Sequence, residues 1–190
     1  MDDAEFDEIY RAHRDSLFRL GVLICGDPRR SEDAVADAFV KVLPRWRGGT
    51  VEHPGPYLRR ALVNGLIGGF RRQAREERHA ARRWGDGRAD LGVDARVSDH
   101  ESVRDALLQL PVTQRAVLAL RYYADLSEAD TADALGISVG TVKSRASRAM
   151  VRLRELLDEV ELTDRKPGVG RLANRQIVDR EPVDREGVDA

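Results

Sequence analysis

Residues 126–145 read LSEADTADALGISVGTVKSR, and this stretch decides the fold class of the chain. Ser127, with Asp130 three positions later, forms a capping-box pattern that predicts the start of a helix. Gly136 predicts where that helix ends, because glycine adopts a positive φ without a steric penalty. Ser138 can cap a second helix directly afterwards. Two short helices joined by a tight turn predict a helix-turn-helix.

The second helix of this motif has two distinct faces. An apolar stripe runs through Val142, Ala149 and Leu156 at helical spacing, which predicts that this face packs on the core. A polar, basic stripe runs beside it, as a recognition helix requires, because its outer residues meet bases and phosphates. The alternative is a surface helix with solvated arginines, but the stripe coincides with the turn glycine and so favours DNA binding. We predict that the DNA-contacting residues here are Ser138, Thr141, Lys143, Ser144, Arg145, Arg148 and Arg152.

The first part of the chain carries three more amphipathic patterns. Apolar residues recur three or four positions apart over residues 6–20, 35–46 and 58–70, and each stripe predicts a helix that buries one face. No strand pattern separates them, so the three helices are expected to bundle. We therefore assign residues 1–74 to an N-terminal helical bundle.

Two segments lack a hydrophobic period. Residues 75–100 are rich in Arg, Gly and Asp and predict a flexible linker. Periodicity returns over residues 101–160, which form the predicted C-terminal helix-turn-helix domain. Residues 161–190 are charged and contain too little apolar surface to fold alone, which predicts a disordered tail. The sequence thus predicts an all-α protein with two small helical domains joined by a flexible linker.

Composition argues against several classes of function. The formal net charge is −1, so a nucleic-acid partner must be met by local clusters of cations. Cys25 is the single cysteine, so neither an internal disulfide nor a thiolate zinc site can form within the chain. The four histidines are scattered and no glycine-rich phosphate loop occurs, so we expect no metal, no cofactor and no enzymatic activity. With neither a signal-peptide pattern nor a membrane-spanning stretch, a cytoplasmic location is expected.

Four short runs in the C-terminal half resemble one known family. These runs are Leu110-Pro111, residues 114–123 (QRAVLALRYY), Leu126-Ser127 and residues 140–145 (GTVKSR). Together and in this order they resemble the C-terminal domain of extracytoplasmic-function sigma factors, which belong to the sigma-70 family. In that family this domain reads the minus-thirty-five promoter element.

The N-terminal half resembles the other domain of the same family. Residues 31–42 (SEDAVADAFVKV) look like the helix that binds the polymerase clamp, although Ala36 stands where glutamine is usual. The resemblance implies that Asp33, Asp37, Phe39 and Lys41 contact polymerase; for Phe39, core packing is an equal alternative. Residues 45–53 match the loop that captures a flipped minus-ten base, and residues 57–72 match the adjoining helix, with Gly68 in place of a common aspartate. The implied minus-ten contacts are Trp46, Tyr57, Arg59, Arg60, Asn64, Arg71 and Arg72.

The resemblance implies a sigma factor that binds core RNA polymerase and promoter DNA and directs promoter recognition, melting and initiation. A regulatory anti-sigma protein is a further expected partner, whereas a membrane or a small-molecule substrate is not. The alternative is a stand-alone helix-turn-helix regulator. This alternative would explain the C-terminal half but would assign no function to the N-terminal bundle.

Overall fold

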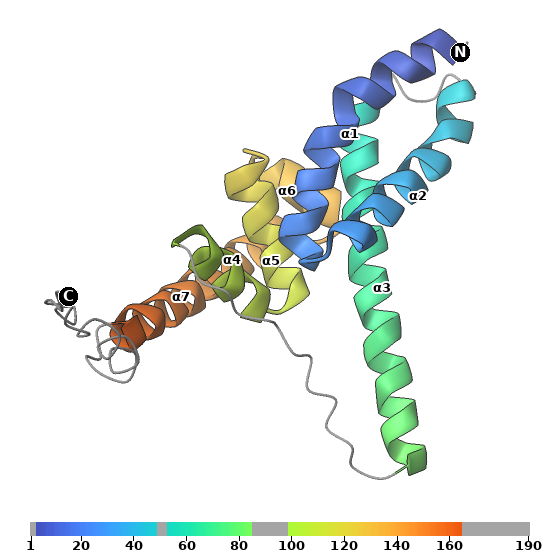
Figure 1. The fold of residues 1–190 in the computed structure, drawn as a ribbon. Coiled ribbons are helices and arrows are strands. Elements are labelled where there is room, and N and C mark those ends of the chain that lie inside the picture. Colours follow the sequence, from blue (N-terminus) through green and yellow to red (C-terminus); the bar gives the residue numbers. More distant parts are fainter. Residues whose placement is uncertain (1–2, 49–52, 85–98, 165–190) are drawn as a thin grey trace, which may run out of the picture.

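The computed structural model describes residues 3–48, 53–84 and 99–164, and every element within these ranges is helical. The prediction of an all-α fold is confirmed. Figure 1 shows three N-terminal helices beside a group of shorter helices that ends in a long one. The elements are α1 (Asp3–Cys25), α2 (Pro28–Arg47), α3 (Pro54–Trp84), α4 (Asp99–Gln109), α5 (Val112–Leu118), the π-helical turn η1 (Ala119–Tyr123), α6 (Glu128–Leu135) and α7 (Val139–Asp164).

The junction between α1 and α2 is fixed by local chemistry. Asp27 caps α2, and its carboxylate accepts from the backbone N–H of Arg29 at 2.8 Å. Pro28 occupies the first turn, where its missing N–H costs no helical hydrogen bond. Further along, the Ser31 hydroxyl donates to the Phe18 carbonyl at 2.8 Å, directly over Gly21. The absence of a side chain at Gly21 therefore makes room for Ser31 of α2 against α1.

We expect opposite effects from alanine at two helical glycines. A Cβ on Gly21 would lie 2.2 Å from Ser31 Oγ, so Gly21→Ala should lower the free energy of unfolding by about 2 kcal/mol through overpacking. A Cβ on Gly68 would meet only the flexible end of Arg72 at 3.9 Å, so Gly68→Ala should raise it by up to about 1 kcal/mol. Urea denaturation of both variants measures the difference. A destabilised Gly68→Ala would show that α3 packs differently from this description.

The observed bounds of α3 and α4 differ from the predicted bounds of the linker. Residues 75–84 continue α3 and α4 begins at Asp99, so the assignment of residues 75–100 to a linker is wrong at both ends. Residues 75–79 of this extension are exposed, and Gln73 Nε2 donates to Glu77 Oε1 at 3.0 Å one turn along the same helix. Helix α7 likewise covers residues 161–164 of the predicted tail. The remaining linker and tail residues, 85–98 and 165–190, lie outside the described residues.

The predicted helix-turn-helix is confirmed in its local detail. The Ser127 hydroxyl accepts from the backbone N–H of Asp130 at 3.0 Å and caps α6. Gly136 ends α6 with φ of 63°, and Ser138 then accepts from the N–H of Thr141 at 3.2 Å to start α7. Val142 is fully buried where α7 crosses α6. The residues of the turn thus determine where α6 ends and where α7 begins.

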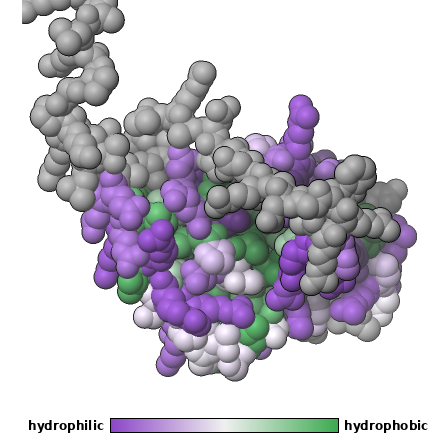
Figure 2. Space-filling model, turned by 90° about the horizontal axis from the view of Figure 1, so that it is seen from below, coloured by the Kyte–Doolittle hydropathy of each residue, from purple (hydrophilic) through white to green (hydrophobic). Residues whose placement is uncertain are grey.

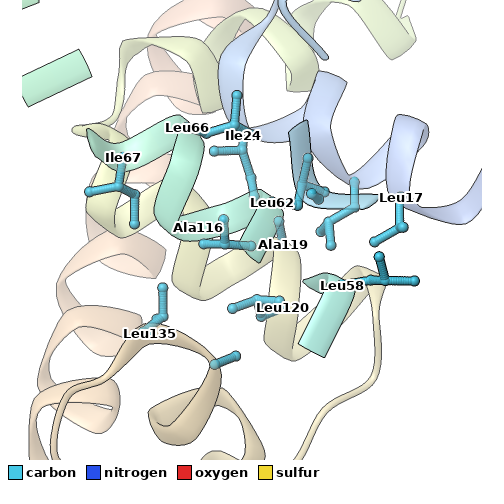
Figure 3. Close-up of a cluster of buried hydrophobic side chains, with 14 of the residues drawn as sticks. Leu17, Ile24, Leu58, Leu62, Leu66, Ile67, Ala116, Ala119, Leu120 and Leu135 are labelled. Carbon is cyan, nitrogen blue, oxygen red and sulfur yellow. The ribbon is translucent and has the colours of Figure 1, made fainter. Parts of the chain in front are cut away.

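The N-terminal helices pack directly on the C-terminal ones. One hydrophobic cluster includes Leu62 and Leu66 of α3 together with Ala116 of α5 and Leu120 of η1. Figure 3 shows these side chains pointing into the same space from the two halves of the chain. Each of the four is at most 2% exposed. The two halves, here called the N-module (α1–α3) and the C-module (α4–α7), therefore share one core.

One face of the described part of the molecule is mainly polar. Figure 2, a view from below, shows hydrophilic side chains bordering a smaller apolar area. Among the described residues, none of the helices combines the length and the hydrophobicity that a membrane span requires.

Candidate nucleic-acid interface

The first candidate surface is the start of α7, where hydrogen bonds order the predicted recognition residues. The hydroxyls of Ser138 and Thr141 lie 2.8 Å apart. The Ser144 hydroxyl donates to the Thr141 carbonyl at 3.1 Å, and Arg148 Nε donates to the Ser144 carbonyl at 3.1 Å. Each partner lies within the same one or two turns, so these side chains are positioned by α7 itself.

Two other predicted contact residues of α7 form exposed ion pairs. Lys143 Nζ lies 3.4 Å from Glu128 of α6, and Arg152 Nη1 lies 3.0 Å from Glu155. Exposed pairs of this kind contribute little and are easily exchanged for a phosphate. Arg145, between them on the stripe, makes no hydrogen bond or ion pair with any residue that the structure describes. Arg145 is half-buried at the start of α7, and no described ion pair has to be broken before it can meet a base.

The second candidate surface is a cleft of about 520 Å³ between α2 and α3. It brings together residues that the sequence analysis assigned to two different partners, polymerase and minus-ten DNA. Four of its lining side chains are cationic and one is anionic. Tyr57, 42% exposed, adds an aromatic face to the wall. The lining residues are Asp37, Lys41, Val42, Arg45, Tyr57, Arg60, Ala61, Asn64, Gly65 and Arg72.

The cleft chemistry suits an unpaired nucleic-acid strand. Cations can follow the phosphates, and an aromatic face can stack on a base. Gly65 leaves the wall open, since even a Cβ there would lie 3.9 Å from Lys41 Nζ. Asn64 supplies an amide at the edge, and in this structure its Nδ2 donates to the carbonyl of Ala134 in α6 at 3.3 Å.

Three predicted minus-ten residues lie outside this cleft. Trp46 is half-buried near the end of α2, and Arg71 is exposed on α3. Arg59 lines a neighbouring cleft with Asp130 and Asp133 of α6.

The predicted base-capturing loop is shorter than expected. Arg45, Trp46 and Arg47 are helical, so the loop assignment of residues 45–53 is wrong for its first three residues. The sequence analysis did not single out Arg45 as a contact, yet the cleft includes it. The sequence feature that could have identified Arg45 is its position one helical turn after Lys41, which places both side chains on the same face of α2. Residues 49–52 of the loop lie outside the described residues.

The predicted polymerase contacts divide into exposed and buried residues. Asp33 is exposed, and Asp37 and Lys41 are exposed partners whose charged atoms lie 3.9 Å apart. Phe39 is only 5% exposed, and its ring packs against Tyr10 at 5.0 Å and against Phe6 at 6.1 Å between centroids. In this structure Phe39 belongs to the core of the N-module and its ring is not available to a partner.

This position predicts a stability effect for Phe39. Phe39→Ala should lower the free energy of unfolding by about 3 kcal/mol, because it removes a buried ring and leaves a cavity. Asp33→Ala, at an exposed position of the same helix, should change it by less than about 0.5 kcal/mol. Thermal and urea denaturation provide the measurement. An unchanged stability for Phe39→Ala would contradict the ring packing seen here.

One histidine of the N-module has a shifted pKa. Burial, and secondly the charge of Arg59, lower the pKa of His13 below its ordinary value of 6.5. Both effects favour the neutral form of the His13 imidazole. Within residues 3–48, 53–84 and 99–164 no group of three His, Cys, Asp or Glu side chains could hold a metal ion.

Comparison with known proteins covers both modules. Residues 100–153 match the family described as Sigma-70, region 4. RNA polymerase sigma-E factor of Streptomyces antibioticus is 34% identical over 169 residues, which cover 85% of this chain and 89% of the relative. ECF RNA polymerase sigma factor SigM of Mycobacterium tuberculosis is 35% identical over 156 residues, with 80% and 76% covered.

A solved structure agrees with the fold. The sigma factor RpoE of Bartonella quintana, crystallised with the anti-sigma factor NepR, superposes with a TM-score of 0.64 at 24% identity, covering 81% of this chain and 97% of that one. The matches to the sequence relatives cover 80–85% of this chain and therefore extend well beyond the helix-turn-helix. On these grounds the chain belongs to the extracytoplasmic-function sigma factors of the sigma-70 family.

Proposed function

We propose that this chain binds core RNA polymerase and directs it to promoters by holding two promoter elements at once. The observation that carries the proposal is the presence of two basic surfaces of different shape in one chain. One is a protruding helix, α7, suited to duplex DNA. The other is the cleft between α2 and α3, suited to a single strand.

At the upstream element, α7 would enter the major groove by its N-terminal turns. Thr141, Ser144 and Arg145 would meet base edges, and Arg148 and Arg152 would meet phosphates. The hydrogen bonds from Ser138 through Arg148 hold this end of the helix in place before DNA arrives. Such preorganisation reduces the entropy lost on binding.

At the minus-ten element, the cleft would hold the unpaired strand after melting. Arg60 and Arg72 would follow its phosphates, while Tyr57 would stack on a base and Asn64 would donate to one. Trapping one melted strand favours the open state of the DNA. Binding energy in this cleft therefore assists melting without any catalytic group, and we assign the chain no enzymatic activity.

The exposed acidic side chains of α2 would dock on polymerase. With Asp33 and Asp37 bound there, polymerase tethers both DNA surfaces and raises their effective concentration at the promoter. A net charge of −1 is compatible with this role, because neither surface has to bind DNA strongly alone. A polymerase-bound role places the chain in the cytoplasm. RpoE is bound by an anti-sigma factor, and we propose that an anti-sigma protein regulates this chain as well.

Co-purification with core RNA polymerase tests the proposal. The wild-type chain should co-elute with the core enzyme on gel filtration. Asp33→Lys combined with Asp37→Lys should weaken binding at least about tenfold, by removing two complementary charges and adding two repelling ones. Glu32→Lys, an exposed charge reversal on the same helix, is the matched control and should bind normally. A wild-type chain that does not co-elute would instead favour a stand-alone regulator.

A further inference from the structure

Helix α7 begins without the residues that usually stabilise the start of a helix. Its first turn contains no acidic side chain, whereas the first turn of α6 contains Glu128 and Asp130. Carboxylates are favoured at this place because they complement the positive end of the helix dipole. Val139 occupies the first position of α7, and a β-branched side chain gives no advantage for helix formation. Local stability therefore does not explain the valine.

Packing of the core does not explain Val139 either. Its side chain is 39% exposed, and neither apolar cluster of the described residues includes it. Val142, three positions later, is fully buried in the first of these clusters, so the two valines lie in different environments. Val139 is thus an aliphatic side chain on the surface that the proposed function assigns to DNA.

The polar groups around Val139 hold the first turn of α7 in place. Ser138 Oγ accepts from the N–H of Thr141 at 3.2 Å, and the two side-chain hydroxyls lie 2.8 Å apart. Lys143 Nζ lies 3.4 Å from Glu128 of α6. Because these contacts lie within the protein, the backbone at Val139 is positioned before DNA binds, which reduces the entropy lost on binding.

Gly140, the next residue, leaves space beside Val139. The nearest described atom to a Cβ at this position, outside the adjoining residues, would be Ser138 Oγ at 4.0 Å, so packing within the protein does not require a glycine. Glycine also disfavours a helix relative to alanine. A glycine that the fold does not need is explained by the close approach of another molecule to the backbone. The first turn of α7 is therefore shaped for close contact with a groove.

We infer that Val139 is a specificity-determining residue, which packs against the C5-methyl group of a thymine in the upstream element. The inference rests on the proposed function, in which α7 enters the major groove by its N-terminal turns. Every Cα–Cβ bond of a helix tilts toward the N-terminus, so the first side chain of α7 points ahead of the helix into that groove. The thymine methyl is the only methyl group that the four bases present there. Val139 therefore selects thymine at one position of the element.

The contact differs in kind from the phosphate contacts of the same helix. Arg148 and Arg152 are proposed to meet phosphates, and this attraction weakens as the salt concentration rises. Apolar burial does not depend on that attraction. The affinity for the whole promoter should therefore fall with added salt, while the preference for thymine at the Val139 position should stay the same.

Removal of single methyl groups from the DNA tests the inference. The full chain is bound to core RNA polymerase, and its affinity is measured for a promoter fragment obtained by run-off transcription. Further fragments carry uracil in place of each thymine of the upstream element in turn. Uracil pairs as thymine does and lacks only the C5-methyl group. One such replacement should weaken binding about fourfold, the effect of burying one methyl group, at low and at high salt. If no uracil replacement weakens binding, the inference is overturned.

Variants of α7 assign the effect to Val139. Val139→Ala should bind the thymine and uracil fragments equally, whereas Val139→Ile, which keeps a branched aliphatic side chain, should retain the preference. Val151→Ala makes the matched change at a 53% exposed valine about 18 Å further along α7, and it should retain the preference too. Urea denaturation checks that all three variants fold as the wild type does. A preference that survives Val139→Ala, or that Val151→Ala removes equally, overturns the inference.

The same measurements distinguish this inference from the proposed function. A polymerase that binds an intact upstream element no better than a scrambled one in the presence of the chain contradicts the proposed function, and the inference with it. A clear preference for the intact element, together with equal binding of every uracil fragment, contradicts only the role of Val139.

Discussion

Replacing Arg60 and Arg72 together by glutamate is expected to abolish promoter-dependent transcription, with a loss of roughly 100-fold or more. Both side chains line the cleft between α2 and α3. The double replacement turns two cations into two anions, so a strand that was attracted to the cleft is repelled. Because the change acts on melted DNA, permanganate footprinting should show no reactive thymines near the start site.

The control for this variant uses the same helix beyond the cleft. Arg75→Glu with Arg78→Glu makes the same change of charge at two exposed arginines that do not line the cleft. Transcription by the control should stay within about threefold of the wild type, since non-specific attraction is all that it loses. Both variants should bind core polymerase normally. If the cleft variant melted promoter DNA as well as the control, the cleft would not be the minus-ten site.

Arg145→Ala is expected to reduce initiation by about 10- to 100-fold, the effect of removing one good contact between an arginine and a guanine. Its side chain lies on the polar stripe of α7 and makes no hydrogen bond or ion pair with any described residue. The loss should concern specificity as well as rate. The wild-type chain should prefer an intact upstream element to a scrambled one, and the variant should not distinguish the two templates.

Arg154→Ala provides the comparison for Arg145→Ala. Arg154 is an exposed arginine of the same helix that lies off the stripe, so its loss should leave the preference between templates intact. A preference that survives Arg145→Ala unchanged would show that other residues of α7 read the upstream element.

The helix-turn-helix could be predicted because its signals are local. A hydroxyl that caps a helix and a glycine that adopts φ of 63° act within a few residues, so the sequence around Ser127 and Gly136 contains all the information needed. The same holds for Asp27 and Pro28 at the start of α2. Such features do not depend on what packs against them.

The ends of α2 and α3 were harder to predict because a solvated helix has no hydrophobic period. Residues 75–84 are helical, yet their composition resembles that of a linker, and the exposed side chains of residues 75–79 leave no buried stripe to detect. The π-helical turn at Ala119–Tyr123 was not predicted at all. Its defining hydrogen bond, from the N–H of Ala124 to the carbonyl of Ala119, has no signature in residue type.

Periodicity could not predict the contact between the modules, because an apolar stripe shows that a helix face is buried but not which element packs against it. One signal was present. Val63 and Ile67 extend the stripe of Leu58, Leu62 and Leu66 sideways, so that α3 has a wider apolar face than one neighbouring helix pair would bury. The stripe indicated a core, and only the three-dimensional arrangement shows that the C-module supplies part of it.

The central claim is that this chain gives core RNA polymerase the ability to recognise promoters. Run-off transcription on fragments of the source genome, with core polymerase alone and with the chain added, measures this directly. Adding the chain should produce discrete transcripts whose start sites share two upstream elements at a constant spacing, and mutation of either element should remove them. If core polymerase initiated no better and no more selectively with the chain than without it, the account of this protein as a promoter-recognition subunit would be wrong.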